Sequence, residues 1–250
     1  MFFKKKTSLK YIPNSGVMVS THNCKVLIDA VHTQDINTIS PLIQGAYPFD
    51  DVTLLLFTHK FQDFFTPDVV NDILTQNTNI TAVMSPEIYD NMTKQKNYNS
   101  SLLSQIITFD IGQTDAIELL VDDIPMEILS MTHDSGMYAG IDNFAYRFEM
   151  NTNIFVHIGN ALPTMYNFQI VGLFEKKVDY LFVPFTFLGS VEGRKVLQRI
   201  NPKKVFITQL PKKELDVNDW ISKSKKAYEK YKSELPNIVF FTQETPNITL

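Results

Sequence analysis

The first residues that could do chemistry follow directly on an apolar run. Residues 52–57 are almost entirely apolar, and they lead through one threonine to His59, with Asp63 four residues further on. An imidazole and a carboxylate can both bind zinc, and either can act as a general acid or base. Phe61 and Phe64 stand in the same segment, and a phenyl ring can do neither. The segment therefore predicts a loop in which two side chains could bind a metal and two phenyl rings could not.

A second chemically competent residue, His133, stands at the end of another apolar run, residues 125–131. Its imidazole could bind a metal or act in acid–base chemistry, or it could be a hydrogen-bonded polar side chain at a strand end.

The elements that must position these residues are strands and helices in alternation. Continuous or alternating apolar residues indicate strands, and apolar residues at helical spacing indicate helices. The helix after the His59 segment has Thr66 as a candidate cap and Pro67 at its first position. We expect strands at residues 11–12, 17–19, 25–30, 52–57, 80–84, 105–109, 116–121, 125–131, 143–150, 153–158, 180–183, 204–208 and 238–241. We expect helices at residues 66–76, from residue 85, and at 168–175, 191–200 and 217–235.

The His59 segment resembles the metal loop of the metallo-β-lactamase fold, whose pattern is T-H-x-H-x-D-H. Here the loop reads T-H-K-F-Q-D-F, so Phe61 and Phe64 stand where that family has two histidines. Upstream, the run V-L-I-D that ends at Asp29 is similar to the first strands of the family, which also end in an aspartate. The resemblance implies that Asp29 orients the metal loop and does not bind metal.

Three later positions extend the resemblance. His133 matches the lone histidine that the family places at a strand end. The segment H-I-G-N puts Asn160 where the family has an aspartate that bridges two metals, and Gln209 stands where the last histidine is expected. The resemblance therefore implies the frame of a dinuclear zinc site that has lost most of its ligands. We expect no resident metal or other cofactor; the alternative is one zinc held weakly by His59 and His133, because a catalytic zinc usually has about three protein ligands. Asp63 and His133 could instead form a metal-free acid–base pair.

The fold that this resemblance implies is α/β, a four-layer αββα sandwich formed by residues 1–250 as a single domain. The similarity is greatest to the small, lactonase-like hydrolases of the family. We expect one edge of the sandwich to carry a ligand pocket and the residual catalytic candidates Asp63 and His133. The candidate pocket residues are Asp29, His59, Phe61, Phe64, Asn160 and Gln209.

Composition and charge exclude several other classes of protein. The chain is 44% hydrophobic and 20% charged with a net charge of −4, so bulk electrostatics give no reason to expect nucleic acid or an anionic membrane as a partner. No run approaches the ~20 apolar residues of a membrane span, and the basic start, residues 1–6, leads into no long apolar segment. Cys24 is the single cysteine, which excludes an internal disulfide. We expect a cytoplasmic protein, with the oligomeric state open.

Several of these residues also have a purely structural interpretation. Phe61 and Phe64 can fill a core instead of contacting a ligand. His157 lies in an apolar strand pattern, which predicts a buried hydrogen-bonding role. His22 and His32 lie in polar turns and are expected at the surface.

Three functional hypotheses follow. The preferred one is a non-catalytic pseudoenzyme that binds a small molecule or a protein partner at the former active-site face. The second is a hydrolase of the ester, lactone or phosphoester class with a mononuclear metal site or a metal-free acid–base pair. The third is a structural interaction subunit, paired with an active relative.

Overall fold

The computed structural model describes residues 6–12, 16–31, 36–134, 140–211 and 213–250. The chain forms two compact units, one of residues 1–110 with 245–250 and one of residues 111–244. We call them unit 1 and unit 2. Each contains one seven-stranded mixed sheet with helices, which confirms the predicted α/β class. That residues 1–250 act as a single domain stays a prediction.

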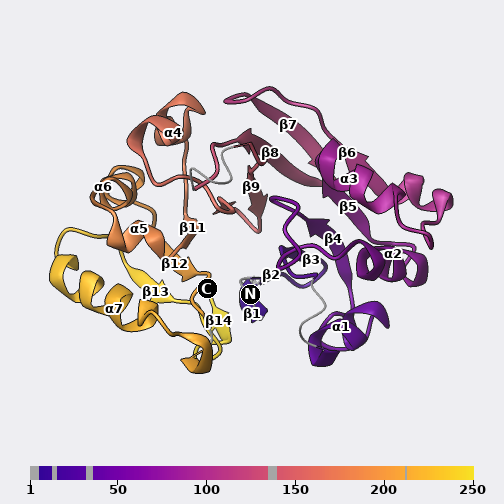
Figure 1. The fold of residues 1–250 in the computed structure, drawn as a ribbon, viewed down its shortest axis with the longest axis horizontal. Coiled ribbons are helices and arrows are strands. Elements are labelled where there is room, and N and C mark those ends of the chain that lie inside the picture. Colours follow the sequence, from indigo (N-terminus) through magenta and orange to yellow (C-terminus); the bar gives the residue numbers. More distant parts are fainter. Residues whose placement is uncertain (1–5, 13–15, 32–35, 135–139, 212) are drawn as a thin grey trace, which may run out of the picture. The chain divides into compact units, whose positions relative to one another are not determined.

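The sheet of unit 1 has the strand order β14-β1-β2-β3-β4-β5-β6 (Figure 1). Strands β3 to β6 are parallel, whereas β14, β1 and β2 join by antiparallel pairs. The strands are β1 (Ser8–Ile12), β2 (Gly16–Ser20), β3 (Lys25–Ile28), β4 (Val52–Leu56), β5 (Thr81–Met84), β6 (Ile106–Thr108) and β14 (Asn247–Thr249). The helices are α1 (Ile36–Ile43), α2 (Pro67–Gln76), α3 (Pro86–Thr93) and the 3-10 helix η2 (Ser100–Gln105).

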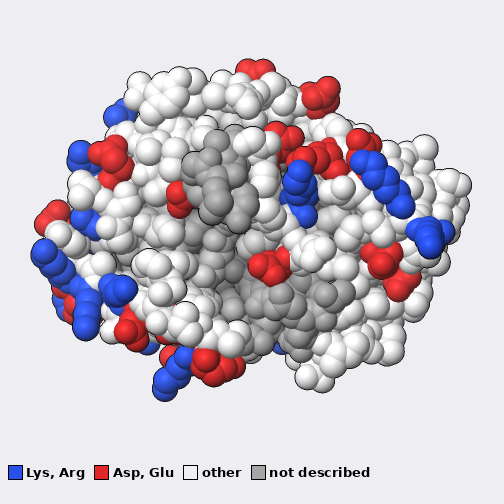
Figure 2. Space-filling view, in the orientation of Figure 1, with Lys and Arg blue, Asp and Glu red and all other residues white. Residues whose placement is uncertain are grey.

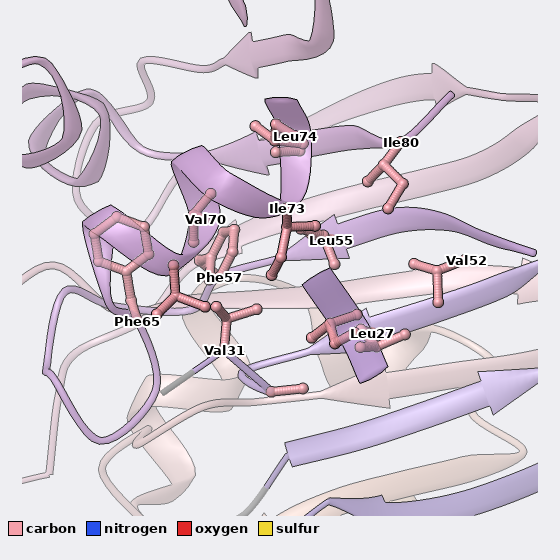
Figure 3. Close-up of a cluster of buried hydrophobic side chains, with 14 of the residues drawn as sticks. Leu27, Val31, Val52, Leu55, Phe57, Phe65, Val70, Ile73, Leu74 and Ile80 are labelled. Atoms are coloured by element: carbon pink, nitrogen blue, oxygen red, sulfur yellow. The ribbon is translucent and has the colours of Figure 1, made fainter. Parts of the chain in front are cut away.

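The core of unit 1 lies between its sheet and its helices. Figure 3 shows Val70, Ile73 and Leu74 of α2 against Leu55 and Phe57 from the β4 region, all of them buried. The apolar run of β4 is buried on both faces, as its continuous sequence pattern predicts. The strand that leads to His59 is therefore held rigidly, so the position of its carboxyl end is fixed.

The sheet of unit 2 has the order β13-β12-β11-β10-β9-β8-β7. Strands β10 to β13 are parallel, and β7, β8 and β9 join by antiparallel pairs. The strands are β7 (Ala116–Val121), β8 (Ile124–Ser130), β9 (Phe144–Met150), β10 (Asn153–His157), β11 (Tyr180–Pro184), β12 (Lys204–Thr208) and β13 (Ile238–Phe240). The helices are α4 (Met165–Ile170), α5 (Thr186–Gly189), α6 (Val191–Ile200) and α7 (Trp220–Tyr231), with 3-10 turns η4 (Leu173–Glu175) and η5 (Lys213–Leu215).

One face of the sheet in unit 2 packs against its helices. Val156, Leu181 and Val205 from three neighbouring strands are fully buried together with Phe168 of α4 and Val196 of α6. The tight turn between β9 and β10 matches the predicted hairpin, because Asn151 and Thr152 both have positive φ, as a type I′ turn requires. These strands therefore have a fixed register, which fixes where each one ends.

A few sequence predictions were wrong in detail. The helix expected at 168–175 is split into α4 and η4, with Gly172 in the left-handed region between them. Thr66 makes no side-chain cap on α2, although Pro67 does begin that helix. Helix α1 was missed, since it contains Pro41, which disfavours a helix interior. Strand β14 was also missed, because a three-residue strand carries almost no periodic signal.

The distribution of surface charge and the length of the helices bear on possible partners. On the face shown in Figure 2, basic and acidic side chains are interspersed. Among the residues that the structure describes, no helix is long and apolar enough to cross a membrane.

Candidate functional site

In unit 1, the candidate residues gather at the carboxyl ends of β3 and β4. Asp29 follows β3 and is fully buried, and its carboxylate accepts hydrogen bonds from the Thr58 amide (2.8 Å) and the Thr58 hydroxyl (2.6 Å). Burial raises the pKa of Asp29 to about 7, against the two Thr58 hydrogen bonds that lower it. Asp29 therefore holds the start of the loop after β4, which is the orienting role that the resemblance implies.

The His59 imidazole is enclosed by this loop. Its Nδ1 lies 2.7 Å from the Thr58 hydroxyl, and the residue is only 1% exposed. The Phe61 ring makes an edge contact with the imidazole at a centroid distance of 5.1 Å, and the Phe64 ring is tilted against it at 4.5 Å. Both positions at which the family has histidines thus present phenyl rings to His59.

The remainder of the loop is a compact turn that returns to the sheet. The amides of Phe64 and Phe65 both donate to the Phe61 carbonyl (2.9 Å each), and Phe65 forms a bridge with Val31. Phe64 is buried and Phe61 is half-buried, whereas the side chain of Asp63 is exposed. The loop therefore uses its rings for packing and presents Asp63 to the surface.

These residues do not fit the donor set of a zinc centre. A zinc site needs about three or four nitrogen, sulfur or oxygen donors around one point. The nearest rings to His59 in its own loop are phenyl groups, which supply none. Within the described parts of the chain, no group of three or more His, Cys, Asp or Glu side chains could hold a metal ion.

In unit 2, the predicted residues meet at the carboxyl ends of β8, β10 and β12. His133 forms an isolated bridge with Ala161, and the Asp134 amide donates to the Asn160 carbonyl at 2.6 Å. The loops after β8 and β10 therefore run side by side. His133 is 4% exposed, and Asn160 is half-buried.

Gln209 joins this group from the end of β12. Its Nε2 donates to the Gly159 carbonyl at 3.4 Å, one residue before Asn160. Gln209 has a φ of +60°, a left-handed conformation that is uncommon for a residue other than glycine and that is found often at functional sites. The backbone therefore turns sharply where the family places its last histidine.

Two buried asparagines that were not predicted hold these loops. Asn143 accepts from the Asn160 amide (2.7 Å) and donates to the Ile158 carbonyl (3.1 Å). Asn167 accepts from the Thr132 amide (2.9 Å) and donates to the Thr132 carbonyl (3.0 Å) and to another carbonyl, that of Leu162 (3.1 Å). Nothing in the sequence distinguishes them from the chain's other asparagines, because their importance depends on backbone groups distant in sequence.

Burial shifts the pKa values of His133, Asp134 and His157 in unit 2. Burial lowers the pKa of His133, against the influence of the neighbouring Asp134. Burial likewise raises the pKa of the Asp134 carboxyl. Burial lowers the pKa of His157 to about 3, and its Nδ1 accepts from the Gly159 amide at 3.2 Å. His157 is therefore a neutral, buried hydrogen-bonding residue, as the sequence predicts.

The structure thus brings the candidate residues together in two groups. One group, in unit 1, consists of Asp29, His59, Phe61 and Phe64 with the exposed Asp63; the other, in unit 2, consists of His133, Asn160 and Gln209. That the two groups face one another across a shared pocket stays a prediction. Of the surface histidines, His22 is exposed as expected, and His32 lies outside the described residues.

No protein-family model matches the sequence, and no curated protein matches it either. Solved structures do match. Igni18, a metallo hydrolase from the archaeon Ignicoccus hospitalis, is 15% identical over 98% of this chain and 97% of its own, with a TM-score of 0.61. The metallo-β-lactamase fold protein YhfI from Bacillus subtilis is 13% identical over 98% and 99%, with a TM-score of 0.62. Yeast PDE1 is 9% identical over 98% and 99%, with a TM-score of 0.61. At these identities the likeness establishes the fold alone, and the predicted resemblance is confirmed at that level.

Proposed function

Given that this chain has the metallo-β-lactamase fold, we propose that it is a non-catalytic member of that fold which binds a small molecule or a protein partner at the carboxyl edge of its strands. In this proposal the protein keeps the loops of the former active site and carries no functional zinc centre. Fold by itself does not decide this, because one fold serves many functions.

The contact of Phe61 and Phe64 with the His59 imidazole carries the proposal. The dinuclear zinc site of the family needs a donor at each of these positions, and here phenyl rings occupy both and exclude water from the imidazole. An apolar surrounding also disfavours a bare dication strongly. Without a metal, no group in this loop lowers the pKa of water from about 16 to about 7, which is how zinc hydrolases generate hydroxide.

The loops of unit 2 support the same proposal. Asn160 and Gln209 are neutral amides at positions where the resemblance calls for a carboxylate and an imidazole. Amides are weak ligands for zinc, but they donate and accept hydrogen bonds well. Asn143 accepts from the Asn160 amide and Asn167 donates to the Thr132 carbonyl, so hydrogen bonds within the chain connect these loops.

A hydrolase remains the second candidate, because burial keeps His133 neutral, the state in which an imidazole binds metal or accepts a proton. In that alternative, His133 acts with His59 on one weakly bound zinc or with Asp63 as an acid–base pair.

Two measurements on the same preparation separate the candidates. The first is elemental analysis of protein purified without chelator and dialysed, for which we expect well under one zinc, manganese or iron per chain. The second is hydrolysis of p-nitrophenyl acetate, a γ-lactone and bis-p-nitrophenyl phosphate, with and without added zinc. Wild type should match a His133→Ala variant on all three substrates. A near-stoichiometric metal content, or turnover that His133→Ala abolishes, would establish the hydrolase instead.

A further inference from the structure

An aromatic pair at the carboxyl edge of unit 2 lies outside every position that the family resemblance marks. Phe185 is the first residue after β11, and Trp220 is the first residue of α7. Their ring centroids are 5.3 Å apart with an interplanar angle of 42°. Because Trp220 contacts Phe185, which directly follows β11, the amino end of α7 lies at the edge at which β11 and β12 terminate.

This pair is next to the predicted ligand-contacting loops. The Phe185 amide donates to the carbonyl of Thr208 at 3.2 Å, and Thr208 directly precedes Gln209. Gln209 in turn donates to the Gly159 carbonyl, beside Asn160. A continuous series of contacts within unit 2 therefore joins the aromatic pair to the two neutral amides.

Trp220 is unusually exposed for a large aromatic residue. Trp220 is 41% exposed, and two other large apolar residues of the same segment, Leu215 and Val217, are 65% and 89% exposed. Phe185 is half-buried. Trp220 is thus a large apolar side chain exposed at the edge where ligands bind in layered α/β proteins, which favours a contact surface there.

The charges around the pair favour an uncharged ligand. The amides of Trp220 and Ile221, which open α7, donate to the Asp216 carboxylate at 2.7 and 2.9 Å, so a carboxylate already occupies the amino end of this helix. The Lys223 ammonium lies 5.0 Å from the centre of the Trp220 ring, where the ring itself attracts it. The Asp134 carboxyl interacts with Thr186, which follows Phe185, and burial raises the pKa of that carboxyl, which favours its uncharged form. Gln209 and Asn160 carry no charge.

We propose that Phe185 and Trp220 form the apolar half of a ligand site whose polar half is the amide of Gln209. Its ligand is an uncharged molecule with a planar apolar ring and at least one hydrogen-bonding group. This inference rests on the proposed ligand-binding function and names the class of ligand. Aromatic side chains provide large contact area to a planar ring, and the amide orients the ring's polar substituent.

Trp220 is the only tryptophan of the chain, so it reports on the site directly. The probe is N-phenyl-1-naphthylamine, a neutral fused-ring compound whose emission rises in apolar surroundings and which accepts energy from tryptophan. We expect saturable binding with quenching of Trp220. The anionic analogue 8-anilinonaphthalene-1-sulfonate carries the same rings and should bind more weakly.

The variants test where the probe binds. Phe185→Ala should weaken binding about three- to tenfold, the range that corresponds to losing one aromatic contact. Phe185→Leu keeps apolar volume without the ring and should weaken it less, which guards against a folding defect in the alanine variant. Tyr166→Ala is the matched control, because Tyr166 is an aromatic residue of α4 that is 70% exposed in the same unit. It should bind the probe like the wild type.

Three results would overturn the inference: unchanged affinity in both Phe185 variants with Trp220 still quenched, tighter binding of the anionic probe, or no saturable binding by wild type. The metal and hydrolysis measurements test the proposed function separately. A metal-free, inactive protein that ignores the probe would leave that function standing and remove this site. A zinc-loaded, active protein that binds the probe would overturn the proposed function and leave this site standing.

Discussion

The Phe64 ring lies 4.5 Å from the His59 imidazole, centroid to centroid, and it stands at a position where the metal loop of the resembling family has a histidine. Phe64 is 8% exposed, and the Nδ1 of the imidazole lies 2.7 Å from the Thr58 hydroxyl. A residue at a ligand position has thus become part of the packing. This relationship leads to the first two predictions.

Truncating the buried ring should destabilise the fold. Phe64→Ala removes a buried phenyl group, so we expect the free energy of unfolding to fall by about 3 kcal/mol. Phe61→Ala should cost clearly less, because Phe61 is only half-buried. Urea unfolding measures both, with the exposed Gln62→Ala as the control from the same loop. Equal, small effects at positions 61 and 64 would show that the rings form a surface and not a core.

Restoring the family's ligands should restore metal binding. The variant with Phe61→His, Phe64→His, Asn160→Asp and Gln209→His supplies every donor of the family pattern that this sequence lacks and keeps His59, Asp63 and His133. We expect it to bind zinc more tightly than the wild type in calorimetric titration. The same variant with His59→Ala is the control and should lose most of the gain. A folded quadruple variant with wild-type affinity would contradict the prediction that these positions form one metal site.

The hydrogen bonds that Asn167 makes to Thr132 and Leu162 should stabilise the loops of unit 2. Asn167→Asp removes both donated hydrogen bonds and brings a carboxylate to the carbonyls of Thr132 and Leu162. We expect a loss of about 1–3 kcal/mol in stability, since buried carbonyls lose their donors. Hydrogen exchange should become faster at the amides of Thr132 and Leu162. Asn23→Asp, in an exposed turn, should change neither quantity.

The buried His157 should make stability depend on pH. Its pKa is about 3 in the folded protein and ordinarily 6.5. Between these two pH values the unfolded chain binds a proton at His157 and the folded chain does not. The contribution of the neutral His157 to the free energy of unfolding is therefore fully present above pH 6.5 and is lost as the pH falls. Compared with His157→Asn, whose Oδ1 can still accept from the Gly159 amide, the wild type should lose about 1.4 kcal/mol between pH ~7.5 and ~5.5.

The difference between the two proteins is the quantity to measure, because Asp29 acts in the opposite direction. Its pKa is raised from 3.8 to about 7, so its contribution falls as pH rises through that interval. Asp29 is present in both proteins and cancels from the difference. A difference that stays constant with pH would mean that His157 is protonated in the folded state.

The sequence alone determined the strands and most of the helices, because buried strands read as continuous apolar runs and surface helices as periodic ones. Helix α6 and strands β7 and β12 match their predicted bounds residue for residue. It also determined where the chain differs from the pattern of the family that it resembles, since Phe61, Phe64, Asn160 and Gln209 differ from that pattern by residue type alone. Short elements such as β14, and α1 with its internal Pro41, gave too little periodic signal.

The tertiary structure decided what those residues do. That Phe64 packs on His59, that Asn143 and Asn167 tie loops distant in sequence, and that Trp220 lies against Phe185 all depend on where strands end in space. A residue's type states which contacts it can make. Which contact it makes is set by the register of the sheet and the packing of the helices, since these bring together backbone groups that the linear pattern does not relate.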